Sequence, residues 1–108
     1  MAKYVYLYHG GKMGGTPEEM EASMAAWKAW MVGMGANCVD MGTPFKGSMW
    51  VKGDGSTVAG TMSADSVSGY TIVEAESMDQ ATEWAKGCPI LKEGGSLEVM
   101  DPMPMPAM

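Results

Sequence analysis

The sequence predicts an α+β fold in which two helices cover one face of an antiparallel sheet. Three observations support this prediction. Residues 3–9 (KYVYLYH) alternate as a β-strand does, residues 17–34 carry an apolar stripe with helical spacing, and residues 70–75 (YTIVEA) are rich in β-branched and aromatic side chains.

Composition limits the functions that the chain can have. It has 108 residues, of which 46% are apolar, and a net charge of −6, values typical of one globular domain with a single core. All 7 basic residues are lysines, so the bidentate grip of arginine on phosphate is absent. Because the net charge is negative, we expect no nucleic-acid partner.

Neither membrane insertion nor export is indicated. No segment approaches the ~20 apolar residues of a membrane span, and the N-terminal run is too short and too rich in tyrosine for a signal peptide. We therefore expect a cytoplasmic protein without a membrane partner, in which Cys38 and Cys88 are free thiols.

No cofactor or metal is expected. Residues 10–15 (GGKMGG) lack the Lys-Ser/Thr pair of a phosphate-binding loop, and one histidine with two separated cysteines gives no zinc-ligand spacing. Met103, Met105 and Met108 have the spacing of a thioether site for Cu(I). Because no histidine or cysteine cluster accompanies them, we interpret the methionines as adaptable apolar side chains.

The first half of the chain begins with the strand at residues 3–9, followed by a helix over about 17–34. Thr16 is the expected N-cap, Pro17 takes the first helical position, and Glu19 completes a capping box. Gly35 ends the helix. An apolar stripe at alternating spacings of four and three residues is expected to face the core: Met20, Met24, Trp27, Met31 and Met34.

The second half supplies the remaining elements. Residues 37–42 (NCVDMG) form a short strand, Asp54-Gly55 marks a hairpin turn, and residues 61–68 are expected to be a polar loop. After the strand at 69–76, Ser77 caps a short helix. A last strand follows at residues 96–100.

Without the hairpin, this order is the βαββαβ unit of a ferredoxin-like fold, with both helices on one sheet face. We predict such a domain over residues 1–101 and a Pro/Met-rich tail over 102–108. The other sheet face is then bare, and a second copy of the chain would cover it in a homodimer. That face would carry either Tyr4, Tyr6, Tyr8, Ile72 and Leu97 or the side chains that alternate with them.

Cys88 lies where the short helix stops. Lys86 is in the last turn, Gly87 takes the left-handed position and Pro89 blocks continuation. A reactive thiolate needs a helix N-terminus, a cation or a histidine nearby, whereas the negative end of a helix raises the pKa of a thiol. We therefore interpret Cys88 as a core residue rather than a nucleophile.

The segments SGYTIVEAESMDQATEWAKGCPIL (68–91) and GGSLEV (94–99) resemble the YCII-related family, whose relatives include the DGPF-motif proteins. The shared features are a Gly-Tyr-led strand, Glu-Ala-x-Ser, a short helix with Ala and Trp, and a Cys-Pro exit. YVYLYHG (4–10), the helix with Met24, Trp27 and Trp30, and VDMGTPF (39–45) are similar to one branch of that family.

This resemblance implies a dimeric α+β barrel, in which two ferredoxin-like sheets pack face to face around a small cavity. It implies no particular reaction, although a His–Asp pair has been proposed as a catalytic dyad in some members. Two departures matter here. Only the glycine of the Asp-Gly-Pro-Phe signature remains, in AGTM (59–62), and the helix histidine of some relatives is missing near Met24–Trp27.

His9 and Asp40 are the candidate catalytic residues. His9 ends the first strand beside a glycine-rich loop, and histidine is a common proton-transfer group in proteins, so His9 could transfer a proton while Asp40 orients it. The alternatives are that His9 only caps the strand and that Asp40 is exposed on a sheet edge. Strand order weighs against direct contact, because the two strands are not neighbours in this fold.

The candidate ligand-binding residues are Tyr6, Tyr8, Trp27, Trp30 and Glu74. For the tryptophans the alternative is core packing, and for Glu74 it is exposure on the rim of the sheet. We therefore expect a small homodimeric protein with a pocket for a small organic molecule. Either it is an acid–base enzyme of isomerase or lyase type that uses His9, or it is a non-catalytic ligand-binding or regulatory dimer. Residues 46–68 are expected to form one wall of the pocket.

Overall fold

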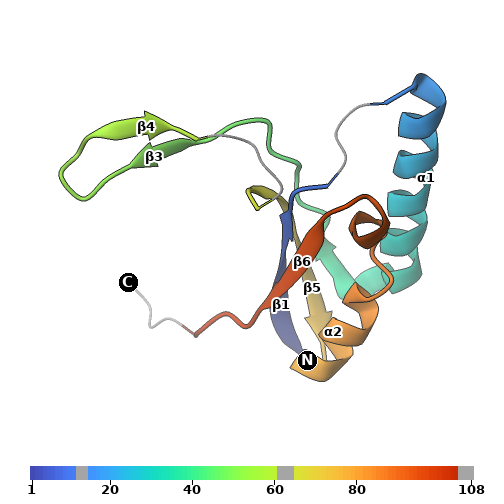
Figure 1. The fold of residues 1–108 in the computed structure, drawn as a ribbon. Helices are drawn as coiled ribbons and strands as arrows, with labels where there is room; N and C mark the ends of the chain where they lie inside the picture. Colours follow the sequence, from blue (N-terminus) through green and yellow to red (C-terminus); the bar gives the residue numbers. More distant parts are fainter. Residues whose placement is uncertain (12–14, 61–64, 105–108) are drawn as a thin grey trace.

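The computed structural model of the chain describes residues 1–11, 15–60 and 65–104. Its elements are β1 (Ala2–His9), α1 (Pro17–Met34), the 3-10 turn η1 (Gly35–Asn37), β2 (Cys38–Asp40), β3 (Met49–Val51), β4 (Thr57–Ala59), β5 (Val67–Ala75), α2 (Met78–Ala85), the 3-10 turn η2 (Pro89–Lys92) and β6 (Ser96–Met100) (Figure 1).

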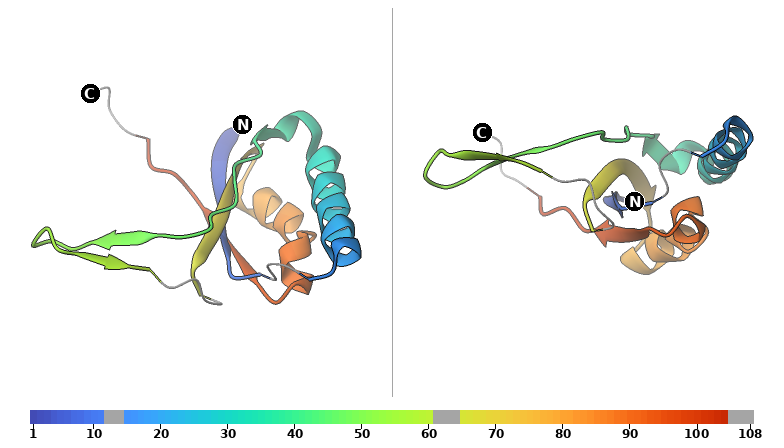
Figure 2. Two further views of the ribbon diagram at one scale, coloured as in Figure 1. Left: turned by 90° about the horizontal axis from the view of Figure 1, so that it is seen from above. Right: turned by 45° about the horizontal axis from the view of Figure 1, so that its top comes forward.

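The main sheet has the strand order β2-β5-β1-β6, and each neighbouring pair is antiparallel. Both helices lie on the same side of this sheet (Figure 2). This arrangement confirms the predicted α+β fold of ferredoxin-like type. Among the described residues, no helix has the length and apolar character needed to cross a bilayer.

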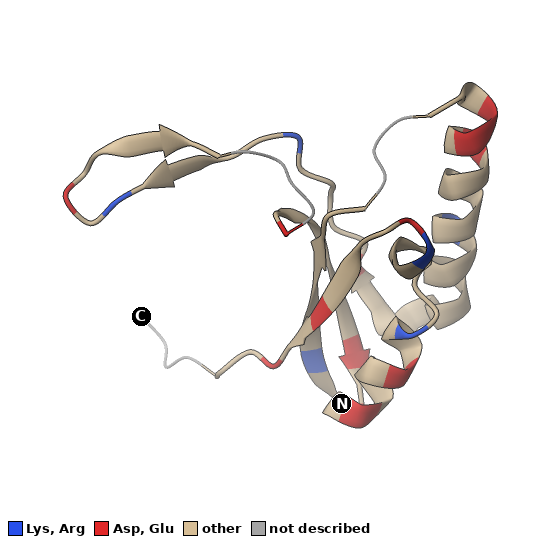
Figure 3. Cartoon of the chain, viewed as in Figure 1, with Lys and Arg blue, Asp and Glu red and all other residues tan. Residues whose placement is uncertain are grey.

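The predicted hairpin is also present, as a separate two-stranded sheet of β3 and β4. Its turn is stabilised by Asp54, whose Oδ1 accepts hydrogen bonds from the backbone N–H of Ser56 at 2.9 Å and from its hydroxyl at 2.6 Å. Gly55 takes a positive φ of 86°, which favours glycine. Figure 3 shows the hairpin standing away from the rest of the molecule, with its charged residues near the turn.

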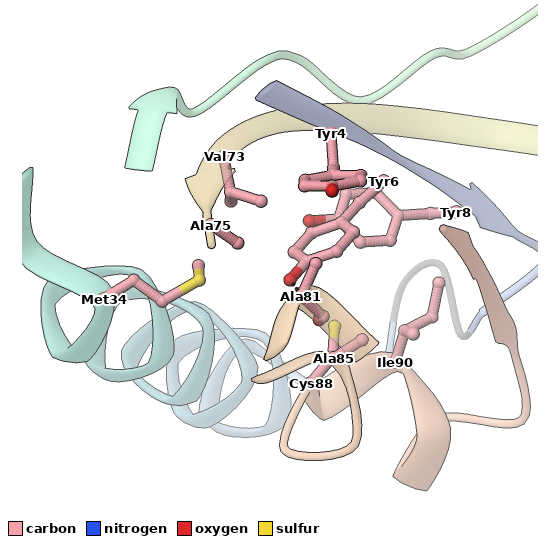
Figure 4. Close-up of a cluster of buried hydrophobic side chains, with 10 residues drawn as sticks. All are labelled: Tyr4, Tyr6, Tyr8, Met34, Val73, Ala75, Ala81, Ala85, Cys88 and Ile90. Carbon is pink, nitrogen blue, oxygen red and sulfur yellow. Dashed lines mark hydrogen bonds between the residues drawn. The ribbon is translucent and has the colours of Figure 1, made fainter. Parts of the chain in front are cut away.

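The core forms between the central strand and the helices. Tyr4, Tyr6 and Tyr8 alternate along β1 and are all buried, and Figure 4 shows them pointing from the strand into the cluster that contains Ala81 and Ala85 of α2. The Tyr6 hydroxyl donates to the Ala81 carbonyl at 2.6 Å, and the Tyr8 hydroxyl donates to Thr71 at 2.6 Å. These bonds give the buried hydroxyls the partners they need.

The structure therefore decides which residues lie on the bare sheet face. The tyrosines face the helices, and Leu97, which pairs with Tyr8, packs against the same core. The alternating residues of β1, β5 and β6 lie on the other face; they include Val5, Leu7, His9, Tyr70, Ile72, Glu74 and Glu98. We refer to these seven residues as the bare face.

Both helices begin where the sequence predicts. The Thr16 hydroxyl accepts a hydrogen bond from the Glu19 N–H at 3.1 Å, and the Ser77 hydroxyl accepts one from the Gln80 N–H at 3.1 Å. These contacts satisfy backbone donors that have no partner inside the helix. The N-cap residues therefore predicted the start of both helices correctly.

The expectation that the whole apolar stripe of α1 is buried is wrong. Met34 is buried, but Met20 and Met24 are 48% and 71% exposed. The reason is the position of the helix. The contacts of α1 are mainly with η2, β2 and η1, so the central strands of the sheet do not cover its first turns (Figure 2). The first turns of α1 therefore border an open space instead of a core.

Two predicted segments are described only in part. The expected loop at 61–68 contains residues 61–64, which lie outside the described residues, and its last two residues already belong to β5. Residues 105–108 of the predicted tail also lie outside the described residues.

The Tyr6→Phe substitution removes the buried hydrogen bond to the Ala81 carbonyl and should lower the free energy of unfolding by about 1 kcal/mol. Urea denaturation measures this change. Tyr70→Phe is the matched control, because its hydroxyl lies 3.5 Å from the Asp40 carboxylate at an exposed position. An equal loss in both variants would show that the Tyr6 bond does not hold α2 to the sheet.

Candidate functional site

A groove of about 1120 Å³ lies between α1 and the sheet. Its apolar wall is the part of the α1 stripe that is not fully buried, with Met20, Met24, Trp27 and Met31. Residues 41–44 and 68–70 form the facing wall, and Tyr8, Ile90 and Glu93 also line the space. The groove therefore lies along the part of the α1 stripe that the core does not cover.

Glu93 provides a fixed carboxylate in the groove. Its Oε1 accepts hydrogen bonds from the Trp27 indole N–H at 3.0 Å and from the Ser23 hydroxyl at 2.9 Å, and the same hydroxyl lies 3.2 Å from Oε2. Ser23 has one hydroxyl hydrogen, so it can donate to only one of the two oxygens at a time. Oε2 therefore keeps acceptor capacity for another donor.

The local sequence explains how Glu93 reaches this position. Pro89 follows Cys88 and begins η2, and Glu93 ends that turn by donating its N–H to the Ile90 carbonyl at 3.0 Å. Ser23 and Trp27 are four residues apart on α1, so they project from one helix face toward the carboxylate. The contact joins α1 to the segment that connects α2 with β6.

Aromatic rings support the α1 side of the groove. Tyr8 and Trp27 pack edge to face with centroids 4.9 Å apart, and Trp27 packs in the same way on Trp30 at 5.9 Å. Tyr6 stacks on Trp30 at 5.8 Å, and the Trp30 indole donates to the Trp84 carbonyl at 3.0 Å. Of the four predicted aromatic ligand-binding residues, Tyr8 and Trp27 line the groove, and Tyr6 and Trp30 do not.

His9 lies on the bare face and not among the groove residues, although the next residues, Gly10 and Gly11, line the groove. Its Nδ1 is 3.1 Å from the Asp65 carbonyl oxygen, and its Nε2 is 3.2 Å from Glu98 Oε1. Both partners are acceptors, so only the doubly protonated ring donates to both. These two contacts hold the imidazole ring between the segment that precedes β5 and strand β6.

Asp40 and Glu74 lie apart from each other, and neither lines the groove. Asp40 Oδ1 accepts the Gly42 N–H at 2.8 Å, and its Oδ2 is 3.5 Å from the Tyr70 hydroxyl. Because β5 lies between β2 and β1, the structure does not bring Asp40 beside His9. Glu74 is on the bare face, in register with Lys3 of β1.

The buried thiol and phenols are protonated at neutral pH. Cys88 is 2% exposed, and its burial raises the pKa of the thiol to about 12. Burial also raises the pKa of Tyr6 to about 12 and that of Tyr8 further. The pKa of Cys38 is raised, first by burial and then by the Asp40 charge. These groups do not supply a nucleophile, and Cys88 lies in the core as predicted.

Sequence reasoning missed Glu93 and Ser23. Glu93 lies in a Lys-Glu-Gly-Gly stretch that reads as an exposed turn, and Ser23 is one polar residue among methionines and alanines. The only local signal is the four-residue spacing from Ser23 to Trp27. Within the described ranges, no three His, Cys, Asp or Glu side chains are grouped so that they could hold a metal ion.

Comparisons with known proteins agree with this fold. The sequence model of the YCII-related domain matches residues 7–105. Among curated proteins, no significant match is found. Among solved structures, the chain is similar to 5-chloro-2-hydroxyhydroquinone dehydrochlorinase (TftG) from Burkholderia phenoliruptrix in complex with 2,5-dihydroxybenzoquinone, with a TM-score of 0.53 and 22% identity over 92% of this chain and 93% of that one.

Cys88 should resist alkylation by iodoacetamide in the native protein at mildly alkaline pH, because it is buried and its pKa is raised to about 12. Mass spectrometry of tryptic peptides measures the labelling of each cysteine, and unfolding in urea should make Cys88 react at the rate of an ordinary thiol. Rapid labelling of native Cys88 would contradict its assignment to the core.

Proposed function

Because the chain belongs to the YCII-related family, we propose that it binds a small, largely apolar organic molecule in the groove beneath α1, with Glu93 as the polar anchor. The observation that carries this proposal is the carboxylate itself. Glu93 is half-buried, is fixed by Ser23 and Trp27, and keeps acceptor capacity at Oε2 inside a mostly apolar groove. Few, well-placed polar groups in an apolar cavity are typical of ligand sites.

The lining favours a flat, aromatic ligand. Met20, Met24 and Met31 offer flexible thioethers that adapt to an aromatic ring, and Trp27 adds a flat aromatic side chain. The volume of about 1120 Å³ slightly exceeds the usual ~300–1000 Å³ of small-molecule sites. A carboxylate anchor favours a ligand that carries a hydrogen-bond donor, such as a hydroxyl or an amine.

The structural neighbour supports the ligand class. The dehydrochlorinase from Burkholderia phenoliruptrix was solved in complex with 2,5-dihydroxybenzoquinone, a planar ring that carries hydroxyl groups. A related fold can therefore hold a molecule of this type. We propose a planar hydroxylated ring as the ligand class for the α1 groove.

If the protein is an enzyme, Glu93 is the group placed to accept a proton from a bound hydroxyl, and the reaction is of isomerase or lyase type. This assignment replaces His9, which lies on the bare face and is held by Asp65 and Glu98. The alternative is a ligand-binding protein without turnover, in which Glu93 only orients the ligand. Both functions start from the same binding step.

We also propose that the bare face is the seam of a homodimer. Val5, Leu7 and Ile72 form an apolar centre on it, and no helix of the described chain covers them. Lys3 opposite Glu74, and His9 beside Glu98, bring both charge signs to this side of the sheet. A surface with both signs can pair with a second copy of itself across a two-fold axis.

Hydroquinone should bind in the groove, whereas 1,4-dimethoxybenzene, which lacks hydroxyl hydrogens, should bind more weakly. The Glu93→Gln substitution should weaken hydroquinone binding by about tenfold or more, since it removes a charged acceptor. Isothermal titration calorimetry measures both affinities. Glu83→Gln is the matched control, because Glu83 is an exposed α2 residue paired with Lys86. Equal affinity of the wild type and Glu93→Gln would contradict the anchor role.

The protein should sediment at twice the 11.4 kDa mass of one chain. Leu7→Glu places a charge at the centre of the bare face and should produce monomers, whereas Leu91→Glu, at a position that is already 47% exposed, should leave the dimer intact. Analytical ultracentrifugation separates these outcomes. A monomeric wild type would refute the dimer.

A further inference from the structure

The β3–β4 hairpin exposes apolar side chains on both of its faces. Trp50 pairs with Val58 on one face, and Met49 and Val51 lie on the other. Trp50 is 68% exposed and Val51 is 70% exposed. An isolated two-stranded hairpin is marginally stable in water, so this segment needs a surface to pack on.

The direction of the hairpin points to that surface. Figures 1 and 2 show that the hairpin and residues 101–104 both leave the main sheet on the side opposite the helices. This side is the bare face. The hairpin therefore extends away from the α1 groove and toward the place where a second sheet would pack.

We propose that the β3–β4 hairpin is an arm that packs against a second copy of the chain, along the edge of the partner's sheet; this proposal rests on the proposed dimer. Residues 46–53 can extend about 25 Å at ~3.3 Å per residue, whereas two packed sheets lie ~10 Å apart. The arm is thus long enough to pass the seam and reach the flank of the second chain.

The character of the arm favours a second copy over other occupants. Neither β3 nor β4 contains a charged residue, so the arm offers no counter-charge for a nucleic acid or a charged peptide. Figure 3 shows the hairpin on the side of the main sheet away from the helices, with its charged residues near the turn. In a two-fold dimer each chain gives one arm and receives one.

The base of the arm allows a clean deletion. The Gly60 N–H donates to the Ser48 carbonyl at 2.9 Å, so these residues form a cross-strand pair. Replacing residues 49–59 by Asn-Gly closes the chain with a two-residue turn and removes the arm. Trp50→Ser combined with Val51→Ser keeps the hairpin but removes two of its apolar side chains, and Lys52→Ser near the turn is the matched control.

Sedimentation equilibrium of the full-length wild type and these variants tests the proposal. The deletion and the Trp50→Ser/Val51→Ser double variant should raise the dimer dissociation constant by at least about thirtyfold, since a buried interface tryptophan is a typical hot spot. Lys52→Ser should leave it unchanged. If the wild type is a dimer and neither the deletion nor the double variant raises its dissociation constant, the arm does not contribute to the interface. That result would overturn the arm proposal and leave the dimer proposal intact. A monomeric wild type would overturn both.

Fluorine NMR of wild-type protein labelled with 5-fluorotryptophan gives an independent readout of the arm, for which a variant is needed only to assign the Trp50 resonance. The Trp50 resonance, assigned by its loss in Trp50→Phe, should move when the wild type is diluted through its dissociation constant. A resonance that stays in place while the dimer dissociates would overturn the proposal.

Discussion

The alternation of side chains along β1 is the constraint on which the rest of the structure depends. Tyr4, Tyr6 and Tyr8 turn toward the helices. On that side the Tyr6 hydroxyl donates to the Ala81 carbonyl and the Tyr8 hydroxyl donates to Thr71. The bond from Tyr6 joins the central strand to α2. Val5, Leu7 and His9 must then point to the opposite face. One choice of strand orientation thus determines the core, the bare face and the side on which the only histidine lies.

The rings of β1 also govern the placement of α1. Trp30 stacks on Tyr6, and Trp27 packs edge to face on Tyr8. Two large indoles between a helix and a sheet hold the helix away from the strands, so the stripe N-terminal to them stays uncovered. The segment after α2 closes one side of this space and brings Glu93 to the Trp27 indole. The groove and its carboxylate are therefore consequences of core packing, with the site and the core sharing Tyr8 and Trp27.

Local patterns predicted the elements well because they depend on local physics. Thr16 and Ser77 are N-caps in the structure, Asp54-Gly55 makes the hairpin turn, and the strand order is that of a ferredoxin-like sheet. The candidate site was harder to predict. The distance between α1 and the sheet depends on how Trp27 and Trp30 pack, and Glu93 meets Ser23 across 70 residues of sequence. No periodicity or motif encodes such a contact, whereas His9 was predicted from its residue type and from its position at a strand end beside a glycine-rich loop.

The most direct test of the groove is the chemical shift of the Trp27 indole N–H in two-dimensional ¹H–¹⁵N NMR during titration with hydroquinone. The chain has 4 tryptophans, and Trp27, which lines the groove and donates to Glu93, reports on the site, with Trp50 of the arm as an internal reference. A saturable shift of the Trp27 signal, with the Trp50 signal unchanged, is the expected result. An unchanged Trp27 signal, together with shifts of the backbone amide signals of His9 and its neighbours, would contradict the account. The ligand would then bind on the bare face and not in the α1 groove.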